Sequence, residues 1–215
     1  MFNLDLPTII SRIITLIIAF TLHEFSHAAT ADALGDDTPR LAGRLTLNPI
    51  AHLDLLGTLL LIFAGFGWAK PVPINPYALR RKTRAGVMLV SIAGPLSNLV
   101  MALLAALPLR FALVPYTTNA NSFLPTPGQF LLEFVFINLT LFMFNLIPLA
   151  PLDGEKVLAY FLPLTWEDTY DRIKIYGPYV LLVIAVIGPR LGFDLLGIII
   201  REPVINLTRF LLGWS

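Results

Sequence analysis

The chain contains no cysteine among its 215 residues. Disulfide bonds, thiolate metal sites and cysteine nucleophiles are therefore all excluded, although this absence indicates no particular compartment. Histidine is also scarce, with only three in the chain. Any metal site must be built from these histidines, from aspartate or glutamate, or from backbone oxygen atoms.

Charged residues are few. They make up 13% of the chain while hydrophobic residues make up 56%, whereas soluble globular domains carry about 25% charged residues. The formal net charge is +1 and the basic residues are interspersed, so nothing favours a nucleic-acid partner. Because no stretch has the ordinary composition of a soluble domain, we expect residues 1–215 to form one domain embedded in the lipid bilayer.

Several apolar segments approach the length of about 20 residues that a transmembrane helix needs. Three are clear: Leu6 to Ala31, Ala85 to Val114, and Gln129 to Leu149. The first lacks a preceding basic region and exceeds the core of a secretion signal, so we expect it to be retained. C-terminal helices are expected within about residues 173–213, where the pattern leaves open one bent span or a hairpin around Pro189.

A shorter apolar segment, Leu53 to Phe66, would form a helix of only about 21 Å, less than the hydrocarbon core of about 30 Å. The next residues, Gly67 to Pro76, are rich in proline and glycine and cannot be helical throughout. We therefore predict an all-α, polytopic transmembrane helical bundle with a short re-entrant or extended segment near residues 53–76.

The connecting regions differ in charge, which predicts their side of the membrane. Basic residues cluster in 40–84 and in 156–174, whereas 115–128 contains no charge. By the positive-inside rule the two basic regions are cytoplasmic. The second clear span then runs outward and the third inward, in what we expect to be the plasma membrane.

The first span carries His23, Glu24 and His27. Histidines at positions i and i+4 share one helix face, so both imidazoles can reach one tetrahedral Zn²⁺. Glu24 is then placed to take a proton from a water molecule at the metal and pass it to a leaving amine. A chance grouping is disfavoured, because each ionisable residue in mid-span costs about 2.5 to 3.5 kcal/mol on insertion scales.

A hydrolytic zinc site needs a third protein ligand and one open position. His52 and Asp153 are the candidates, although Asp153 could instead be a helix-capping residue at the membrane surface. If Asp153 lies at the cytoplasmic end of the third span, the first helix must run inward to bring its histidines to the same depth. Residues 1–7 contain no Lys or Arg, which agrees with an external start. The segment Leu53 to Phe66 must then enter and return on one side.

Three motifs occur in order on successive spans: His23 to His27, Ala93 to Asn98, and Asn145 to Gly154. Together they resemble the site-2 protease family of intramembrane zinc metalloproteases, over a core from about residue 8 to 160. The stretches Thr46 to His52 and Gly67 to Pro76 further resemble the compact subgroup of that family that lacks PDZ and CBS domains.

The resemblance implies that His23, His27 and Asp153 bind zinc and that Glu24 activates water. It implies an endopeptidase that cleaves in or near the transmembrane segments of membrane-spanning protein or peptide substrates. It also suggests that Asn145 holds the substrate backbone or the developing oxyanion.

Other residues near these motifs allow more than one interpretation. His52 could polarise the scissile carbonyl or be a surface or capping residue. Asn98 could contact the substrate or bond between membrane helices. Gly94 is expected to allow close helix packing or, with Pro95, a local kink that opens the site.

One departure from the family pattern follows the aspartate. The family often continues with a second glycine and an arginine, whereas Glu155 and Lys156 follow Gly154 here. Glu155 could tune the metal site or pair with Lys156 on the surface.

Two other functions share parts of this pattern. A metal-dependent transporter would bury His and Asp, but it would not need a glutamate beside the first ligand, and inverted repeats are not evident. A catalytically silent metal-binding membrane protein would have lost Glu24 or a ligand. The sequence does not indicate the substrate's identity or the oligomeric state.

Overall fold

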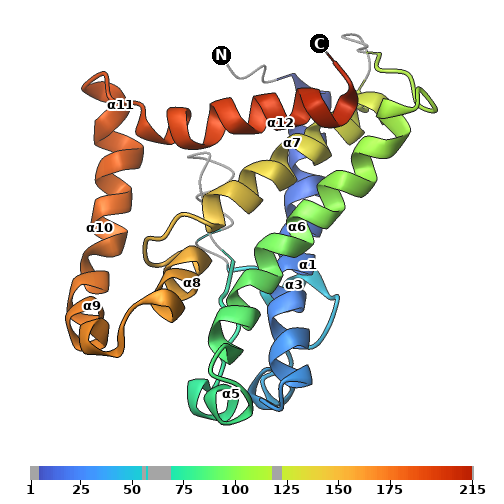
Figure 1. Ribbon diagram of the computed structural model, residues 1–215. Coiled ribbons are helices and arrows are strands. Elements are labelled where there is room, and N and C mark those ends of the chain that lie inside the picture. The colour runs from blue at the N-terminus through green and yellow to red at the C-terminus, as the bar shows by residue number, and fades with distance from the viewer. Residues whose placement is uncertain (1–4, 55–56, 58–68, 118–122, 215) are drawn as a thin grey trace.

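The computed structural model describes residues 5–54, 57, 69–117 and 123–214. Within these ranges the chain is built from helices, and its only strand-like feature is an antiparallel bridge between Leu53 and Ala69 (Figure 1). Four helical stretches are long and apolar enough to cross a membrane. The predicted all-α transmembrane bundle is confirmed, and the protein is a multi-pass membrane protein.

Three long helices form the bundle: α1 (Leu6–Ala33), α6 (Gly86–Arg110) and α7 (Pro127–Asn145). They pack pairwise against one another. The spans were predicted at the right places, but α6 and α7 end a few residues before the apolar runs do. For α7 the reason is Pro148, because proline clashes with the preceding helical turn.

The apolar core lies where α6 and α7 meet. Ala102 and Ala106 of α6 are buried against Val135 and Leu139 of α7. Small residues let helices approach closely in lipid, where packing rather than the hydrophobic effect drives association. Part of the same core comes from α12 (Glu202–Leu212), which crosses the end of the bundle (Figure 1).

The C-terminal region was expected to form either one bent span or a hairpin. A helical rod runs from Glu167 to Arg190 and includes α9 (Glu167–Ile173), α10 (Gly177–Leu182) and α11 (Gly188–Arg190). The chain turns at Gly192, where φ is +85°. The next helix then runs across the bundle rather than back along the rod, so the structure has neither expected form (Figure 1).

In the described part of the chain, three short helices lie between α1 and α6. They are α2 (Thr38–Leu41), α3 (Pro49–His52) and α5 (Pro76–Lys82). All three have proline in the first turn, where a helix leaves its N–H groups unpaired and proline has none to lose. Asn48 and Asn75 cap α3 and α5 by accepting backbone N–H groups.

The segment Leu53 to Phe66 lies almost wholly outside the described residues. Its flanks are described: Leu53 forms its bridge with Ala69, and the Lys70 N–H donates to the His52 carbonyl at 2.8 Å. The chain therefore leaves and returns at one place, as an entry-and-return segment requires.

Residues 70–75, which follow this segment, contain no helix. Prolines stand at positions 71, 73 and 76. Each proline disfavours the helical conformation in the residue before it and pushes that residue toward an extended one. The segment is therefore extended, as its composition predicted.

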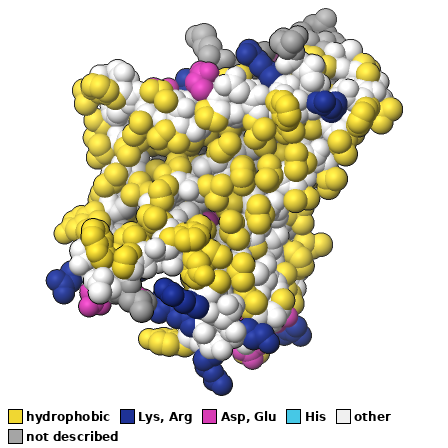
Figure 2. All heavy atoms as spheres, in the orientation of Figure 1, with side chains coloured by type: hydrophobic (Ala, Val, Ile, Leu, Met, Phe, Trp, Pro, Cys, Tyr) yellow, Lys and Arg dark blue, Asp and Glu magenta, His cyan; other side chains and the backbone are white. Residues whose placement is uncertain are grey.

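The molecular surface fits a lipid environment. Figure 2 shows hydrophobic side chains covering the middle of the molecule and basic side chains gathered at its two ends. Large apolar side chains such as Leu104 and Tyr179 are mostly exposed. Apolar patches of this extent are rare on soluble monomers, so this belt faces the hydrocarbon core.

Candidate metal centre

Two histidines and one aspartate converge inside the bundle. His23 and His27, one turn apart on α1, place their Nε2 atoms 3.0 Å from each other. Asp153 Oδ2 lies 3.1 Å from the first and 3.2 Å from the second. All three side chains are buried, with exposed fractions of 6%, 7% and 9%. The structure thus brings together the three residues that the family resemblance implies as ligands.

Asp153 reaches the histidines because the chain folds back after α7. It is the first residue of α8 (Asp153–Phe161), which packs against α6. A Cβ atom on Gly154 would collide with the carbonyl of Leu146, so only glycine permits this approach. The N-cap of α8 is Leu152. Asp153 therefore contacts the two imidazoles rather than capping the helix.

Hydrogen bonds fix the proton on each imidazole. His27 Nδ1 lies 2.7 Å from the carbonyl oxygen of Val90, which can only accept. His23 Nδ1 lies 2.6 Å from Asn98 Oδ1. Both Nδ1 atoms therefore carry the hydrogen, and both Nε2 atoms present a lone pair to the centre of the site. Metal-binding histidines are commonly oriented in this way.

The orientation of the Asn98 amide is itself determined by a chain of hydrogen bonds. Asn138 donates its Nδ2 to the carbonyl of Phe134 at 2.9 Å, so its Oδ1 faces Asn98. Asn98 Nδ2 donates to that oxygen at 3.0 Å, which leaves its own Oδ1 for His23. Asn98 and Asn138 are fully buried. The chain of bonds spans α7, α6 and α1.

The donor set fits a zinc ion. Two nitrogen lone pairs and a carboxylate oxygen lie within 3.2 Å of one another and have no proton to share, so they repel unless a cation joins them. Ligands of tetrahedral zinc, each about 2.0 to 2.2 Å from the metal, lie roughly 3.4 Å apart. The observed spacing is close to this value.

Gly94 makes room for the site. A Cβ atom there would collide with His27 Nε2 and lie 2.7 Å from His23 Nε2. Of the two roles expected for this residue, close packing is the one that the structure displays, and it is packing against the imidazoles.

Replacing Asn98 with leucine is expected to weaken zinc binding about 10- to 100-fold, the usual cost of losing a residue that orients a metal ligand. His23 would lose the acceptor for its Nδ1–H. Competition with a chromophoric chelator measures the change. Thr140→Val is the matched control, because Thr140 donates to the Phe136 carbonyl of its own helix. Equal zinc affinity in both variants would show that the Asn98 bond does not support the site.

Glu24 is buried beside the metal ligands, with 8% of its surface exposed. It does not belong to the convergent group of three. Its carboxylate interacts with the backbone N–H of Val72 and with the positive charge of Arg44. It is thus a carboxylate next to the ligands that remains available for proton transfer.

Asn145 and His52, predicted to be catalytic, lie in different settings. Asn145 is the last residue of α7 and donates its Nδ2 to the Leu141 carbonyl at 3.0 Å. His52 is fully buried in α3, where its Nε2 lies 2.7 Å from the Thr46 carbonyl. The structure does not place His52 in the group with the three ligands. Both catalytic roles stay predictions.

Glu155 is buried, so it does not lie on the surface as one alternative expected. The ammonium of Lys156 lies 3.9 Å from Asp153 Oδ1. Among the described residues, the ion pair of Lys156 is therefore with the candidate metal ligand rather than with Glu155.

Sequence reasoning did not identify Asn138, Arg44 and Val72. Asn138 had a signal, because a polar amide in an apolar span often bonds to another helix. Arg44 was one basic residue among many in a region assigned to the cytoplasm. Val72 interacts through its backbone N–H, which almost every residue type has, so its identity as valine gives no indication of this contact.

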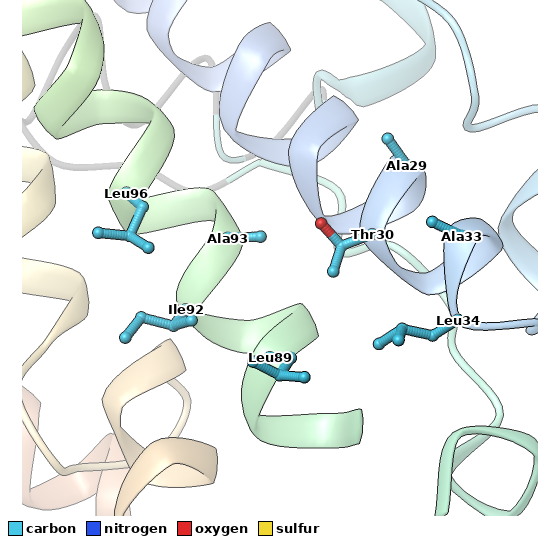
Figure 3. Close-up of a pocket in the computed structure, with 8 residues that line it drawn as sticks. All are labelled: Ala29, Thr30, Ala33, Leu34, Leu89, Ile92, Ala93 and Leu96. Carbon is cyan, nitrogen blue, oxygen red and sulfur yellow. The ribbon is translucent and has the colours of Figure 1, made fainter. Parts of the chain in front are cut away.

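A separate groove lies on the surface between α1 and α6 (Figure 3). Its volume is about 450 Å³, and alanine and leucine side chains such as Ala29, Ala33 and Leu89 line it. Apart from Thr30, the lining is apolar. The groove therefore lacks groups for metal binding or proton transfer.

The relatives found by comparison with known proteins all carry the name of a putative zinc metalloprotease. The chain is 41% identical to a Bacillus subtilis protein named "Putative zinc metalloprotease YwhC", over 92% of this chain and 86% of that protein. It is 31% identical to "Putative zinc metalloprotease Rip2" of Mycobacterium tuberculosis, over 85% of this chain and 69% of that protein. The Mycolicibacterium smegmatis protein of the same name is 30% identical, over 82% and 66%. No family model matches the chain. No solved structure matches it either.

Proposed function

Because the chain belongs to the site-2 protease family of zinc metalloproteases, we propose that it hydrolyses peptide bonds in or near the transmembrane segments of membrane protein substrates. That it is a metalloprotease with Zn²⁺ as its cofactor follows from its relatives. Cleavage within the membrane is supported by one observation above all. His23, Glu24 and His27 lie inside a helix apolar enough to span the bilayer.

Each residue around the metal has a distinct task. His23, His27 and Asp153 hold the ion through two Nε2 atoms and one carboxylate oxygen. Asn98 and the Val90 carbonyl keep the two imidazoles in the orientation that presents those atoms. When bound, Zn²⁺ polarises the substrate carbonyl and lowers the pKa of a water molecule to about 7.

Glu24 is the proposed general base and general acid. Its carboxylate takes a proton from the attacking water and delivers it to the leaving amine, which requires a carboxylate that does not itself bind the metal. Its burial keeps bulk water away from these transfers. Asn145 is proposed to donate a hydrogen bond to the substrate backbone or to the developing oxyanion, and His52 is proposed to polarise the scissile carbonyl.

The extended residues 70–75 are the proposed docking edge for the substrate. A membrane-spanning helix satisfies its backbone hydrogen bonds internally, so it must unwind locally before a peptide bond is accessible. An extended segment can hold the unwound stretch by pairing with it as an added strand. The interaction between Val72 and Glu24 supports this assignment, because it puts the segment next to the proposed general base.

The site is proposed to lie toward the cytoplasmic face of the plasma membrane. This orientation is supported by the positive charge of α5, because basic residues favour the cytoplasmic side. The helix ends in Arg80, Arg81 and Lys82, near the end of the bundle where α6 begins. The metal-dependent transporter is disfavoured because it gives Glu24 no task. The silent binding protein is disfavoured because all four residues of the proposed site are present.

The proposal is tested by reconstituting the protein in lipid vesicles with a synthetic transmembrane peptide. We expect cleavage within or beside the apolar stretch of the peptide, loss of cleavage on zinc chelation, and recovery on zinc addition. A soluble peptide with the residues around the cleaved bond is the control. If only the soluble peptide is cleaved, the enzyme is a metalloprotease but its substrate does not span the membrane.

A further inference from the structure

Arg44 is a buried cation that donates its hydrogen bonds to backbone carbonyls, while its charge also acts on the Glu24 carboxylate. Its side chain is enclosed, with only 5% of its surface exposed. Its Nη1 donates to the carbonyls of Ala51 at 2.7 Å and Lys70 at 3.0 Å, and its Nη2 donates to that of Pro71 at 3.2 Å. Across the part of the chain that the structure describes, the ion pairs of arginine do not include Arg44. Burying a charge in this way is costly and calls for a reason beyond pairing.

The segment that Arg44 holds has few other backbone hydrogen bonds, although Ile74 packs against the buried cluster of Ala31, Leu79 and Val90. Residues 70–75 are extended but do not belong to a sheet. Lys70 bonds to the His52 carbonyl at one end, and at the other end the Asn75 N–H donates to Asp36 Oδ2 at 2.6 Å. Arg44 supplies partners for two carbonyls between these points, as a neighbouring strand would.

Proline leaves this segment with a single backbone donor where it passes Glu24. Pro71 and Pro73 have no N–H, so Val72 carries the only one among these three residues. That N–H interacts with the Glu24 carboxylate. The position of this donor follows from the adjoining carbonyl of Pro71, which Arg44 holds.

We propose that Arg44 is a positioning residue for the reaction: by holding the carbonyls of Lys70 and Pro71, it sets the Val72 N–H against the Glu24 carboxylate and so fixes the orientation of the general base. The inference rests on the proposed function of Glu24. Arg44 contacts neither the metal ligands nor the substrate in this role. Besides the direct effect of its charge on Glu24, it acts through the backbone. Displacement of a catalytic group by about 1 Å can cost 100-fold in rate.

The guanidinium suits this role better than an ammonium would. Its planar fork offers five N–H donors in fixed directions, whereas lysine offers one point of charge on a flexible stem. Three carbonyls from two separate stretches of chain, at Ala51 and at 70–71, are bonded at once. Lysine would reach part of this set, so Arg44→Lys is expected to retain part of the rate.

The test compares Arg44→Gln and Arg44→Lys with wild type in the vesicle assay with the transmembrane peptide. We expect Arg44→Gln to lower kcat about 10- to 100-fold, with a smaller change in KM and with zinc content unchanged, and Arg44→Lys to fall in between. Arg40→Gln is the matched control, since Arg40 lies in the same basic region but is exposed and paired with Asp32. Wild-type kcat in Arg44→Gln, or a loss of kcat that parallels a loss of zinc, would overturn the proposal.

A second variant keeps the test decisive if Arg44→Gln does not fold. Val72→Pro removes the N–H beside Glu24 in an already extended, proline-flanked segment and leaves Arg44 intact. We expect a similar fall in kcat, and a double variant with Arg44→Gln no worse than the poorer single variant, because both changes break one linkage. Wild-type kcat in Val72→Pro, or multiplied losses in the double variant, would contradict it. If Glu24→Gln cleaves normally, the proposed role of Glu24 as general base fails instead.

Discussion

Replacing Glu24 with glutamine is expected to lower kcat about 1,000-fold or more while leaving the bound zinc in place. Glutamine has nearly the same shape but cannot accept the proton of the attacking water, and general acid–base catalysis contributes about 10² to 10⁴-fold. Zinc should stay because Glu24 is not one of the three convergent ligands. Cleavage of the transmembrane peptide and zinc content are measured on the same preparation.

Asp32→Asn is the control for this change, because Asp32 is a second carboxylate on α1 that pairs with Arg40 at the helix end. It should cleave at the wild-type rate. Normal cleavage by Glu24→Gln would remove Glu24 from the mechanism. Loss of zinc from that variant would indicate that Glu24 helps to hold the metal.

Replacing Asp153 with alanine is expected to weaken zinc binding by more than about 100-fold. Losing a residue that only orients a ligand costs about 10- to 100-fold, and Asp153 offers a ligand atom of its own and the only carboxylate of the convergent group. The two imidazoles would remain, held by Asn98 and Val90. Competition against a chelator of known affinity, under conditions where wild type retains its zinc, gives the change.

Two further variants show whether a change in zinc affinity is specific to Asp153. Asp168→Ala removes an exposed carboxylate from α9 and should bind zinc as wild type does. Glu155 is buried two residues from Asp153, so Glu155→Gln added to Asp153→Ala shows whether it takes over as a ligand. Unchanged zinc affinity in both the single and the double variant would mean that the third ligand is misassigned.

The convergence of the site could be predicted because depth in a membrane is a strong constraint. Once charge placement set the direction of each span, His23 and His27 could meet Asp153 only if α1 ran inward, and the structure brings the three together. The link from His23 through Asn98 to Asn138 could not be derived. Hydropathy and charge give the depth of a residue along its helix but not the rotation of the helix toward its neighbours.

The C-terminal region illustrates the same limit. Pro189 and Gly192 marked an interruption, and the chain does turn there. The direction taken afterwards depends on contacts with other helices, such as that of Val204 with the core between α6 and α7. A stretch of apolar residues cannot distinguish a helix across the bundle from a second span.

The hydrogen-bond chain from Asn138 to His23 also has a thermodynamic consequence. The three proposed zinc ligands present their lone pairs together only when α1, α6, α7 and α8 are assembled, so we expect the ion to bind the assembled bundle far better than separate helices. By linkage, metal at 100 times its dissociation constant adds about 2.7 kcal/mol to the stability of the assembled form. Zinc supply would therefore influence how much of the protein persists in the membrane as well as how fast each copy works.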